Sequence, residues 1–587
     1  MTALQWLFFI LIVQLIHGLG TWKLYVKAGR QAWEAFIPVY NAIVLMQIIN
    51  RPKWYTFLLF IPIINLIMIP VVWVETIRSF GYNSTKDTAL VILTLGFYIY
   101  YINYTQNPTY ITDRSLVPKN KTADTVSSLL FAIVVATFVH TYFIQPFTIP
   151  TSSLEKSLLV GDFLFVSKYN YGARTPMTTV AAPMVHDTIP FIKTKSYTIW
   201  PQLPYFRLPG YEKIKNNDIV VFNWPIDTVY QFRDPLHRYA WKPIDKRSNY
   251  VKRCVGIPGD KIEVKNSELY VNDKVLVLSE RAKPQFSYSA KVEPVDNIDY
   301  NTLFSDLNTH DRYGFLAEQK TAYFPALTSE NVEKLKKIPG VSNLEKMIDT
   351  TNTIFSYEFK IDPKIKDIEL QNIITRIKES NKFVVFEDKN KNLLCINRLP
   401  LEFVNLIKSQ KSVISTKEMH DIFPHGPNQK NWTKDNLGPI YIPQAGKTVE
   451  LNIETLPYYK RIITEYEGNT LQQTGNEIRI NGQIATSYTF KQDYYWMMGD
   501  NRHNSEDSRY WGYVPADHIV GKPIFIWMSW DSNAQGIMNK IRWDRMFTTV
   551  SGEGQPQSYF KYFLFLLAGY FAFDYFRSKK KNKEENQ

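Results

Sequence analysis

The segment YVKRCVGIPGDKIEV, residues 250–264, predicts a strand, a Pro-Gly turn and a second strand. Ahead of it, DIVVFNWP (Asp218–Pro225) is a short apolar run of the kind that forms a buried strand. Further along, EIRINGQIA (residues 477–485) places Asn481-Gly482 between two alternating runs, which is a strong signal for a β-hairpin. Strands at this spacing predict a twisted, mostly antiparallel β domain rather than βαβ units.

This β domain is divided in the sequence into two parts, residues 147–276 and 476–558. The residues between them, 277–475, carry mixed signals, with helix-like pieces such as NVEKLKKI and QNIITRIKES and no internal repeat. We interpret this stretch as a large α+β insertion of unassigned role.

The composition excludes several classes of protein. The chain has 587 residues, of which 25 are Gly, 32 are Pro and only 2 are Cys, so it is neither collagen-like nor a disulfide scaffold. The formal net charge of +13 is concentrated at the ends: residues 1–146 carry +5 and residues 577–587 carry +3. Because the long centre is nearly balanced, a nucleic-acid partner is not expected.

Apolar runs at both ends of the chain predict a multi-span helical membrane anchor. Four of them have 17–19 residues, close to the ~20 needed to cross a bilayer: Ala3–Leu19, Thr56–Val74, Thr88–Tyr104 and Val126–Ile144. We therefore predict a membrane region over residues 1–122 with about three transmembrane helices, and a transmembrane anchor over residues 123–146. Residues 559–587 are predicted to form a C-terminal transmembrane helix and a basic tail, although Tyr562–Phe576 is short and contains Asp574.

Basic residues predict the orientation of these segments. Lys and Arg cluster after the first run, after the third run and in the tail. The positive-inside rule then places these loops in the cytoplasm and residues ~147–558 outside. This topology depends on Trp33–Ile49, which Pro38 and Asn41 interrupt and which we interpret as interfacial or re-entrant.

Three polar features could carry chemistry. Pro150-Thr151-Ser152-Ser153-Leu154 follows the fourth apolar run so closely that Ser153 lies within roughly 30 Å of the membrane edge. Lys252 occupies a predicted strand beside apolar neighbours, where burial would lower its pKa and let it accept a proton from a Ser hydroxyl. GDNRHNSEDSRYWG (Gly499–Gly512) is dense in small polar and charged residues, as in a hydrogen-bonded loop that positions other groups.

Together these segments resemble the bacterial type I signal (leader) peptidases, membrane-bound proteases of the Ser/Lys dyad type. Five segments occur in the family's order, over about a quarter of the chain. They are the fourth apolar run, FTIPTSSLEKSLLVGDFLFVSK, DIVVFNWP, YVKRCVGIPGDKI and MMGDNRHNSEDSRYWGYVP.

The resemblance implies a role for each matching residue. Ser153 would be the nucleophile and Lys252 the general base. The Ser153 N–H and the Thr151 hydroxyl would form the oxyanion hole, and Ser505 would orient Lys252. A supporting polar network would consist of Arg253, Asp500, Asp507 and Arg509. The shallow substrate pockets would be lined by Ile149, Pro150, Leu154, Leu158, Tyr250 and Val251.

The chain departs from the family pattern at several of these positions. Ser152 and Leu154 stand where the family usually has Gly and Met, so two adjacent hydroxyls compete for the role of nucleophile. Spacing from Pro150 favours Ser153. Lys156-Ser157 replaces a common Pro-Thr, and His503 replaces a frequent Asp.

The resemblance implies a signal peptidase-like β domain that removes signal peptides from exported preproteins, with small residues, chiefly Ala, at one and three residues before the cut. It implies the bacterial cytoplasmic membrane as location, with the lipid bilayer and a possible secretion translocon as partners, and neither metal nor cofactor. Two alternatives remain. Ser153-x-x-Lys156 also fits the S-x-x-K pattern of penicillin-binding proteins, which transfer acyl groups. A membrane-tethered scaffold without activity is the other.

Overall fold

The computed structural model describes residues 3–117, 121–228, 240–293, 314–316, 320–349, 356–379, 384–388, 392–397, 401–419, 422–425, 429, 431–552 and 554–585. It separates into two compact units. The first unit consists of Met1–Pro146, Val166–Lys213 and Asp227–Ser248, and the second of Phe147–Phe165, Ile214–Ile226 and Asn249–Gln587. Each unit is described by itself.

The first unit contains the N-terminal helices, packed around their own apolar core. They are α1 (Ala3–Lys27), α2 (Tyr40–Ile48), α3 (Tyr55–Leu58), α4 (Ile64–Ser79), α5 (Thr85–Leu93), α6 (Tyr98–Thr105) and α7 (Lys121–Tyr142). Side chains such as Tyr25, Met46 and Ile102 are fully buried in this core. By contrast, most of the apolar side chains along α1 and α7 are exposed, as expected of helices that face lipid.

Two of the predicted spans are not continuous helices. Thr56–Val74 is divided between α3 and α4 at Ile63, which has a φ of 71°. Thr88–Tyr104 is divided between α5 and α6, which meet at an angle of 114° beside Leu95 and Gly96, both with positive φ. A right-handed helix cannot pass through residues with positive φ, and apolar composition alone did not show these breaks. Whether either of these two runs crosses the membrane therefore stays a prediction.

Within the described residues, α1 and α7 are the helices long and apolar enough to cross a membrane, with a third span if the α5–α6 pair counts as one. The C-terminal helix α15 (Phe560–Glu585) is long, but it is not among these candidates. Its membrane insertion and the number of spans stay predictions.

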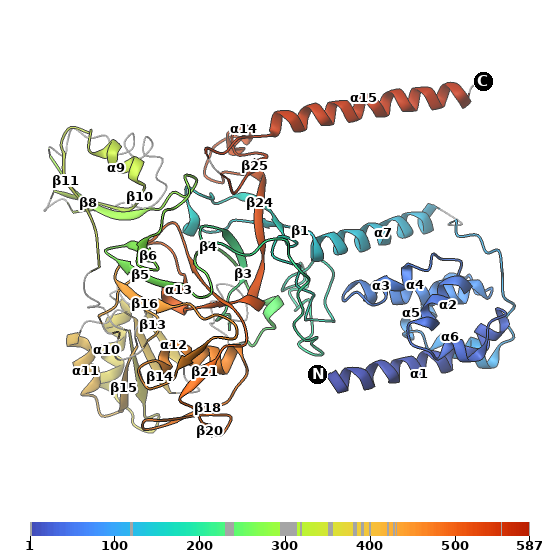
Figure 1. Ribbon diagram of the computed structural model, residues 1–587, viewed down its shortest axis with the longest axis horizontal. Coiled ribbons are helices and arrows are strands. Elements are labelled where there is room, and N and C mark those ends of the chain that lie inside the picture. Colours follow the sequence, from blue (N-terminus) through green and yellow to red (C-terminus); the bar gives the residue numbers. More distant parts are fainter. Residues whose placement is uncertain are drawn as a thin grey trace. The chain divides into compact units, whose positions relative to one another are not determined.

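The β domain is built on an eight-stranded sheet with the order β1-β2-β24-β3-β4-β22-β23, to which β25 is added beside β24 (Figure 1). These strands are β1 (Ile144–Thr148), β2 (Asp162–Ser167), β3 (Ile219–Asn223), β4 (Asn249–Gly256), β22 (Tyr494–Met498), β23 (Val514–Pro515), β24 (Ile519–Ser529) and β25 (Thr548–Thr549). β4 pairs antiparallel with both β3 and β22, and β3 pairs antiparallel with β24. The mostly antiparallel β domain is thus confirmed, and β4, which carries Lys252, lies between β3 and β22 in the sheet order.

A second sheet, β16-β5-β6-β7, corrects the predicted end of the insertion. Its strands are β5 (Lys261–Lys265), β6 (Glu268–Val271), β7 (Lys274–Val275) and β16 (Leu437–Tyr441). Ile440 of β16 pairs with Ile262 of β5, and both side chains are buried in the core that also holds Trp496. Leu451 and Leu456 lie in the same core. Residues 437–475, which the sequence analysis assigns to the insertion 277–475, therefore belong to the β domain, because their apolar side chains are buried against strands that precede the insertion.

The smaller strands and helix that follow β16 complete this part of the domain. They are β17 (Thr448–Glu450), α12 (Leu456–Arg461), β18 (Leu471–Thr474), β19 (Glu477–Ile480), β20 (Gln483–Ile484) and β21 (Ser487–Thr489). β19 and β20 form the predicted hairpin, with Asn481 and Gly482 both at positive φ in the two-residue turn.

The described residues between β7 and β16 contain two small sheets. The first has the order β11-β8-β10-β9 and carries one helix: β8 (Phe286–Val292), β9 (Gly314–Leu316), β10 (Thr321–Leu327), α9 (Ser329–Leu335) and β11 (Val341–Lys346). The second has the order β13-β14-β12-β15: β12 (Ser356–Ile361), α10 (Ile368–Glu379), β13 (Val384–Asp388), β14 (Leu393–Asn397), α11 (Leu401–Lys408) and β15 (Val413–Met419). This βαββαβ succession is that of a ferredoxin-like fold.

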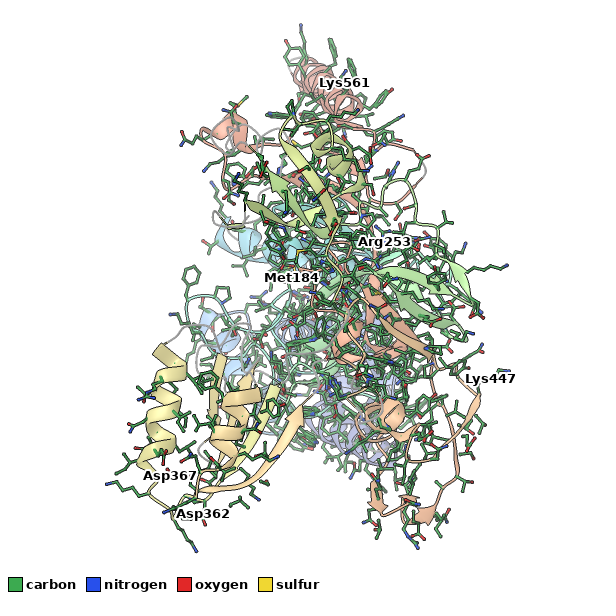
Figure 2. The ribbon with its side chains drawn as sticks, turned by 90° about the vertical axis from the view of Figure 1, so that its left-hand side faces the viewer. Met184, Arg253, Asp362, Asp367, Lys447 and Lys561 are labelled. Carbon is green, nitrogen blue, oxygen red and sulfur yellow. The ribbon has the colours of Figure 1, made fainter. Side chains whose placement is uncertain are left out.

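The ferredoxin-like subdomain has its own core and its own helix cap. Phe359, Leu394 and Ile407 are fully buried in it. Asp367 precedes α10 and accepts hydrogen bonds from the Leu370 N–H (3.0 Å) and the Ser412 hydroxyl (2.8 Å). The second bond connects the start of α10 to the residue before β15. Figure 2 shows Asp367 near Asp362 at one end of the subdomain.

Candidate active site

The chain between β1 and β2 holds Ser153 in a fixed turn. The Ile149 N–H donates to the Asp162 carbonyl and the Gly161 N–H donates to the Ile149 carbonyl, both at 2.9 Å. A short 3-10 helix, Ser152–Leu154, follows at once. Leu154 and Leu158 are both 1% exposed, so their side chains anchor the turn in the interior of the domain. The apolar anchors and the two backbone bonds thus fix the direction of the Ser153 side chain.

Lys252 reaches Ser153 from the neighbouring interior strand. Its Nζ lies 2.5 Å from the Ser153 Oγ, although the two residues are 99 positions apart in the sequence. Lys252 is 2% exposed and Ser153 is 8% exposed. A hydroxyl within hydrogen-bond distance of an amine, both shielded from water, is the arrangement that an activated serine nucleophile requires.

The surroundings of Lys252 favour its neutral form. Burial lowers the pKa of Lys252 to about 8, while the carboxylates of Asp507 and Glu506 act in the opposite direction. A buried ammonium loses its hydration, and the carboxylates offset only part of that loss. Above pH 8, most Lys252 side chains can therefore accept a proton from Ser153.

Two buried ion pairs hold the loop that faces the dyad. The Arg253 guanidinium donates to both carboxylate oxygens of Asp500, at 2.8 and 2.6 Å, and Arg509 does the same to Asp507 at 2.8 Å each. Arg253 lies in the interior of the second unit (Figure 2). Burial alone would raise the pKa of both carboxyls, but the arginines outweigh it and the pKa values are lowered. The predicted supporting network is thus assembled, and its four members are charged.

The same loop binds the Ser153 turn directly. The Asn501 N–H donates to the Ser153 carbonyl at 3.1 Å, and the Ser157 hydroxyl donates to Asp500 at 2.6 Å. Neither contact was assigned from the sequence. The sequence analysis includes Asn501 only as a member of the polar segment 499–512. It names Ser157 only because Lys156-Ser157 departs from the family pattern.

The structure distinguishes the two adjacent serines. The Ser152 hydroxyl accepts a hydrogen bond from the Asn504 side-chain amide at 2.9 Å. Ser153, in contrast, has its Oγ at the Lys252 amine. Only Ser153 is placed against a group that can act as a base.

Ser505 lies beside the dyad, but the hydrogen bond that we predicted to Lys252 is absent. Its buried hydroxyl makes no hydrogen bond to Lys252 among the described residues, and it acts instead on the Asp507 carboxyl, whose pKa it helps to lower. A Cβ added to Gly499 would lie 2.2 Å from the Ser505 Oγ and 2.6 Å from the Ser153 carbonyl oxygen. Glycine at 499 therefore permits the close approach of Ser505 to the turn, while an orienting role for Ser505 stays a prediction.

The predicted pocket residues are of three kinds. Ile149, Leu154 and Leu158 are buried, Pro150 is exposed, and Tyr250 and Val251 are half-buried. Leu154 and Leu158 thus contribute to the floor beneath the turn rather than to an open wall. The Thr151 side chain, predicted to serve the oxyanion hole, is half-buried beside Ser153. These substrate-binding roles stay predictions.

Gln285, which the sequence analysis missed, ties the turn to the loop. Its backbone accepts a hydrogen bond from the Arg502 N–H (3.0 Å) and donates one to the Asp500 carbonyl (2.8 Å). Its side-chain amide donates to the Glu155 carbonyl at 2.8 Å, and the residue is 1% exposed. A single glutamine at the start of the insertion has no sequence signal, since its function depends on two segments 130 and more positions away.

We expect Gln285→Met to lower kcat by roughly 10–100-fold with little change in KM. Methionine keeps the shape but leaves the buried Glu155 carbonyl without its donor, and small displacements of a nucleophile have effects of this size. Steady-state kinetics on a cleavable peptide measure it, with the exposed Gln472→Met as control. An equal fall in kcat in Gln285→Met and Gln472→Met, or a change in KM alone, would contradict a positioning role for Gln285.

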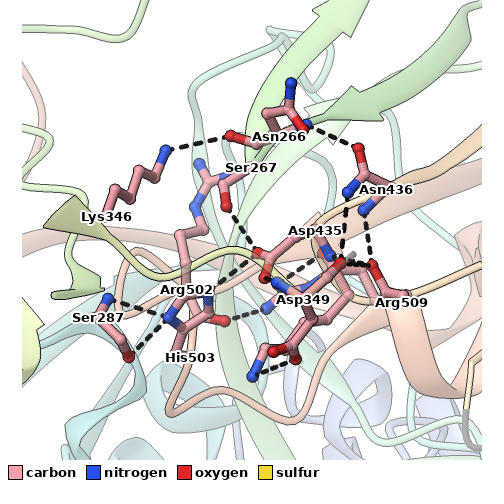
Figure 3. Close-up of polar contacts among 12 residues, drawn as sticks. Asn266, Ser267, Ser287, Lys346, Asp349, Asp435, Asn436, Arg502, His503 and Arg509 are labelled. Carbon is pink, nitrogen blue, oxygen red and sulfur yellow. Dashed lines mark hydrogen bonds and ion pairs between the residues drawn. The ribbon is translucent and has the colours of Figure 1, made fainter. Parts of the chain in front are cut away.

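His503 joins the first small sheet to the same loop (Figure 3). Its Nδ1 accepts the Ser287 N–H at 2.9 Å, and its Nε2 lies 2.9 Å from the Asp435 carboxylate. Ser287 is buried and donates its hydroxyl to the Pro325 carbonyl at 2.8 Å. This serine, histidine and aspartate therefore form a structural link between the first small sheet and the loop.

Comparisons with known proteins agree with this geometry. A family model described as signal peptidase, peptidase S26, matches residues 122–322 and 442–530. The unmatched interval between them contains the ferredoxin-like subdomain. A second model, described only as a family of unknown function, matches residues 33–113.

Among characterised proteins, the chain is similar to several named signal peptidase I. The protein of Buchnera aphidicola subsp. Acyrthosiphon pisum (strain APS) is 26% identical over 431 residues, which cover 73% of this chain and 82% of that protein. That of Rickettsia akari (strain Hartford) is 25% identical over 292 residues, 46% of this chain and 92% of that protein. With the motifs in family order and a buried Ser–Lys pair at their centre, residues 122–322 and 442–530 form a part of the chain that is similar to the signal peptidase family of serine peptidases.

Proposed function

We propose that this protein is a membrane-bound serine endopeptidase that removes signal peptides from exported preproteins through a Ser153/Lys252 dyad. The observation that carries the proposal is the 2.5 Å separation of the Lys252 Nζ and the Ser153 Oγ in a buried site. The relatives named signal peptidase I support the substrate class. An inactive scaffold would not need this contact, and the S-x-x-K reading would require Lys156 to take the place that Lys252 occupies.

In the proposed reaction, neutral Lys252 takes the proton of the Ser153 hydroxyl, and the Oγ attacks the carbonyl carbon of the scissile bond. The Ser153 N–H and the Thr151 hydroxyl stabilise the oxyanion; one such donor contributes roughly 10²–10³ in rate. Lys252 then gives its proton to the leaving amine of the mature protein. Water hydrolyses the acyl-enzyme and releases the signal peptide.

The substrate would bind as an added strand. The register of β22 on β4 begins at Arg253, so the edge of β4 at Val251 and Lys252 lies beyond that pairing. β1, which leads to Ser153, is the terminal strand of its sheet. An extended peptide paired with these two edges would present small side chains, chiefly Ala, to the pockets before the cut.

The proposed location is the bacterial cytoplasmic membrane, with several spans and with residues ~147–558 on its outer side. The apolar helices α1 and α7 support membrane attachment, and the basic loops support the orientation. A secretion translocon is a further proposed partner.

The test is cleavage of a purified preprotein with an Ala-x-Ala site by the full chain in detergent micelles. We expect one cut, immediately after the second Ala, identified by the mass of both products. The matched control preprotein carries Phe at both Ala positions and should remain intact. Absence of cleavage, cutting at another position or equal cleavage of the control would overturn the proposal, and acylation of Ser153 by penicillin would favour the penicillin-binding alternative.

A further inference from the structure

A cavity adjoins the turn that holds Ser153, and Ser152 is among its lining residues. Its volume is about 230 Å³. Three segments line it: the turn itself, the insertion and the loop after β24. The lining residues are Ser152, Glu155, Lys156, Val160, Gln285, Ala326, Asp531, Ser532, Asn533 and Arg542.

The position of the cavity relates it to one part of a substrate. Residues before the cut would occupy the edges of β1 and β4, and no residue of those edges lines the cavity. When the scissile bond of an extended peptide lies at Ser153, the residues after that bond must continue past the turn. Ser152 of this turn forms one wall of the cavity. The residues that follow the cut are therefore the part of the chain that meets it.

The walls of the cavity are polar and carry charges of both signs. Arg542 pairs with Asp531 at 3.2 Å and donates to the Val160 carbonyl at 2.9 Å, so this wall is fixed. Gln285 and Ala326 of the insertion are buried, whereas Ser532 and Asn533 form an exposed rim. The volume is below the roughly 300–1,000 Å³ of drug-sized pockets, which suits one or two side chains rather than a long segment.

We propose that this cavity binds the first residues of the mature protein, directly after the scissile bond, and that the insertion thereby takes part in substrate selection. The inference rests on the proposed function. It gives the insertion a role in the same site: Gln285 and Ala326 supply the wall that faces Asp531 and Arg542. Polar side chains that can hydrogen-bond to these walls are the favoured occupants.

The test uses preproteins with one signal peptide and one Ala-x-Ala site but different mature N-termini, Gln-Asn or Gly-Gly. The wild type should cleave the Gln-Asn substrate about tenfold faster in kcat/KM, the size expected for one side-chain pocket. Ser532→Trp, on the exposed rim, should abolish that preference, so that the ratio of kcat/KM for the two substrates falls to about one. Gln535→Trp, exposed on the same loop but outside the lining, is the matched control.

The outcomes separate this inference from the proposed function. Equal kcat/KM for both substrates in the wild type overturns the cavity proposal while the peptidase stands. An equal loss on both substrates in Ser532→Trp also overturns it, and Asn533→Trp repeats the measurement at a second rim position. If the wild type cleaves neither preprotein, the proposed function itself fails.

Discussion

Ser153→Ala is expected to lower the rate of preprotein cleavage by about 10⁴-fold or more, whereas Ser152→Ala should retain most of the wild-type rate. The reason is geometric. The Ser153 Oγ is the hydroxyl at the Lys252 amine, while the Ser152 Oγ accepts a hydrogen bond from Asn504. Removal of a nucleophile leaves only binding and oxyanion stabilisation, so the loss is large.

The measurement is single-turnover cleavage of one Ala-x-Ala preprotein by wild type and both variants. Thermal unfolding serves as the control for folding, because the loss of one hydroxyl in a short turn should change stability little. If Ser152→Ala is inactive and Ser153→Ala is active, Ser152 and not Ser153 is the nucleophile. Full activity in both variants would remove the dyad assignment.

Lys252→Met should be equally inactive and yet more stable than the wild type at pH 7. Burial lowers the pKa of Lys252 to about 8, from 10.5 for the free side chain. Below pH 8 the folded protein therefore holds an ammonium that is better solvated in the unfolded chain, a difference of ~3 kcal/mol. Methionine has a similar volume and carries no charge, so unfolding in denaturant at pH 7 should require more free energy.

The sign of the pH dependence follows from the same shift. Between pH 8 and 10.5 the unfolded state binds more protons at this site than the folded state, so the Lys252 contribution to stability rises with pH across that window. The stability difference between Lys252→Met and wild type should shrink over the same range. A constant difference would show that the lysine is not buried as an amine in the folded protein.

Activity should follow the neutral fraction of Lys252. In the wild type, kcat/KM should fall about tenfold for each pH unit below 8 and level off above it, because only the neutral amine accepts the Ser153 proton. Activity that does not change down to pH 5 would argue against a lysine base. A peptide without titratable side chains near the cut serves as the substrate for this profile.

Local patterns were sufficient for much of the fold. The hairpin at Asn481-Gly482 and the helix α10 were predicted because each depends on residues within a few positions of one another. The helix breaks at Ile63 and Leu95 were not predicted, because the composition of an apolar run does not indicate where a residue has a positive φ. The end of the insertion was missed for another reason: whether Ile440 packs with Ile262 depends on a pairing across 178 positions.

The sequence by itself determined the family, the antiparallel β domain and the candidate pair Ser153 and Lys252, since motif order and strand spacing are properties of contiguous residues. Only the tertiary structure decided which of two serines faces the amine, that Ser505 does not bond to Lys252, and that Gln285 and His503 connect the insertion to the reactive loop. The physical reason is that each of these depends on contacts between segments about 100 to 350 positions apart, which form only when the sheet places β4, the Ser153 turn and residues 499–512 side by side.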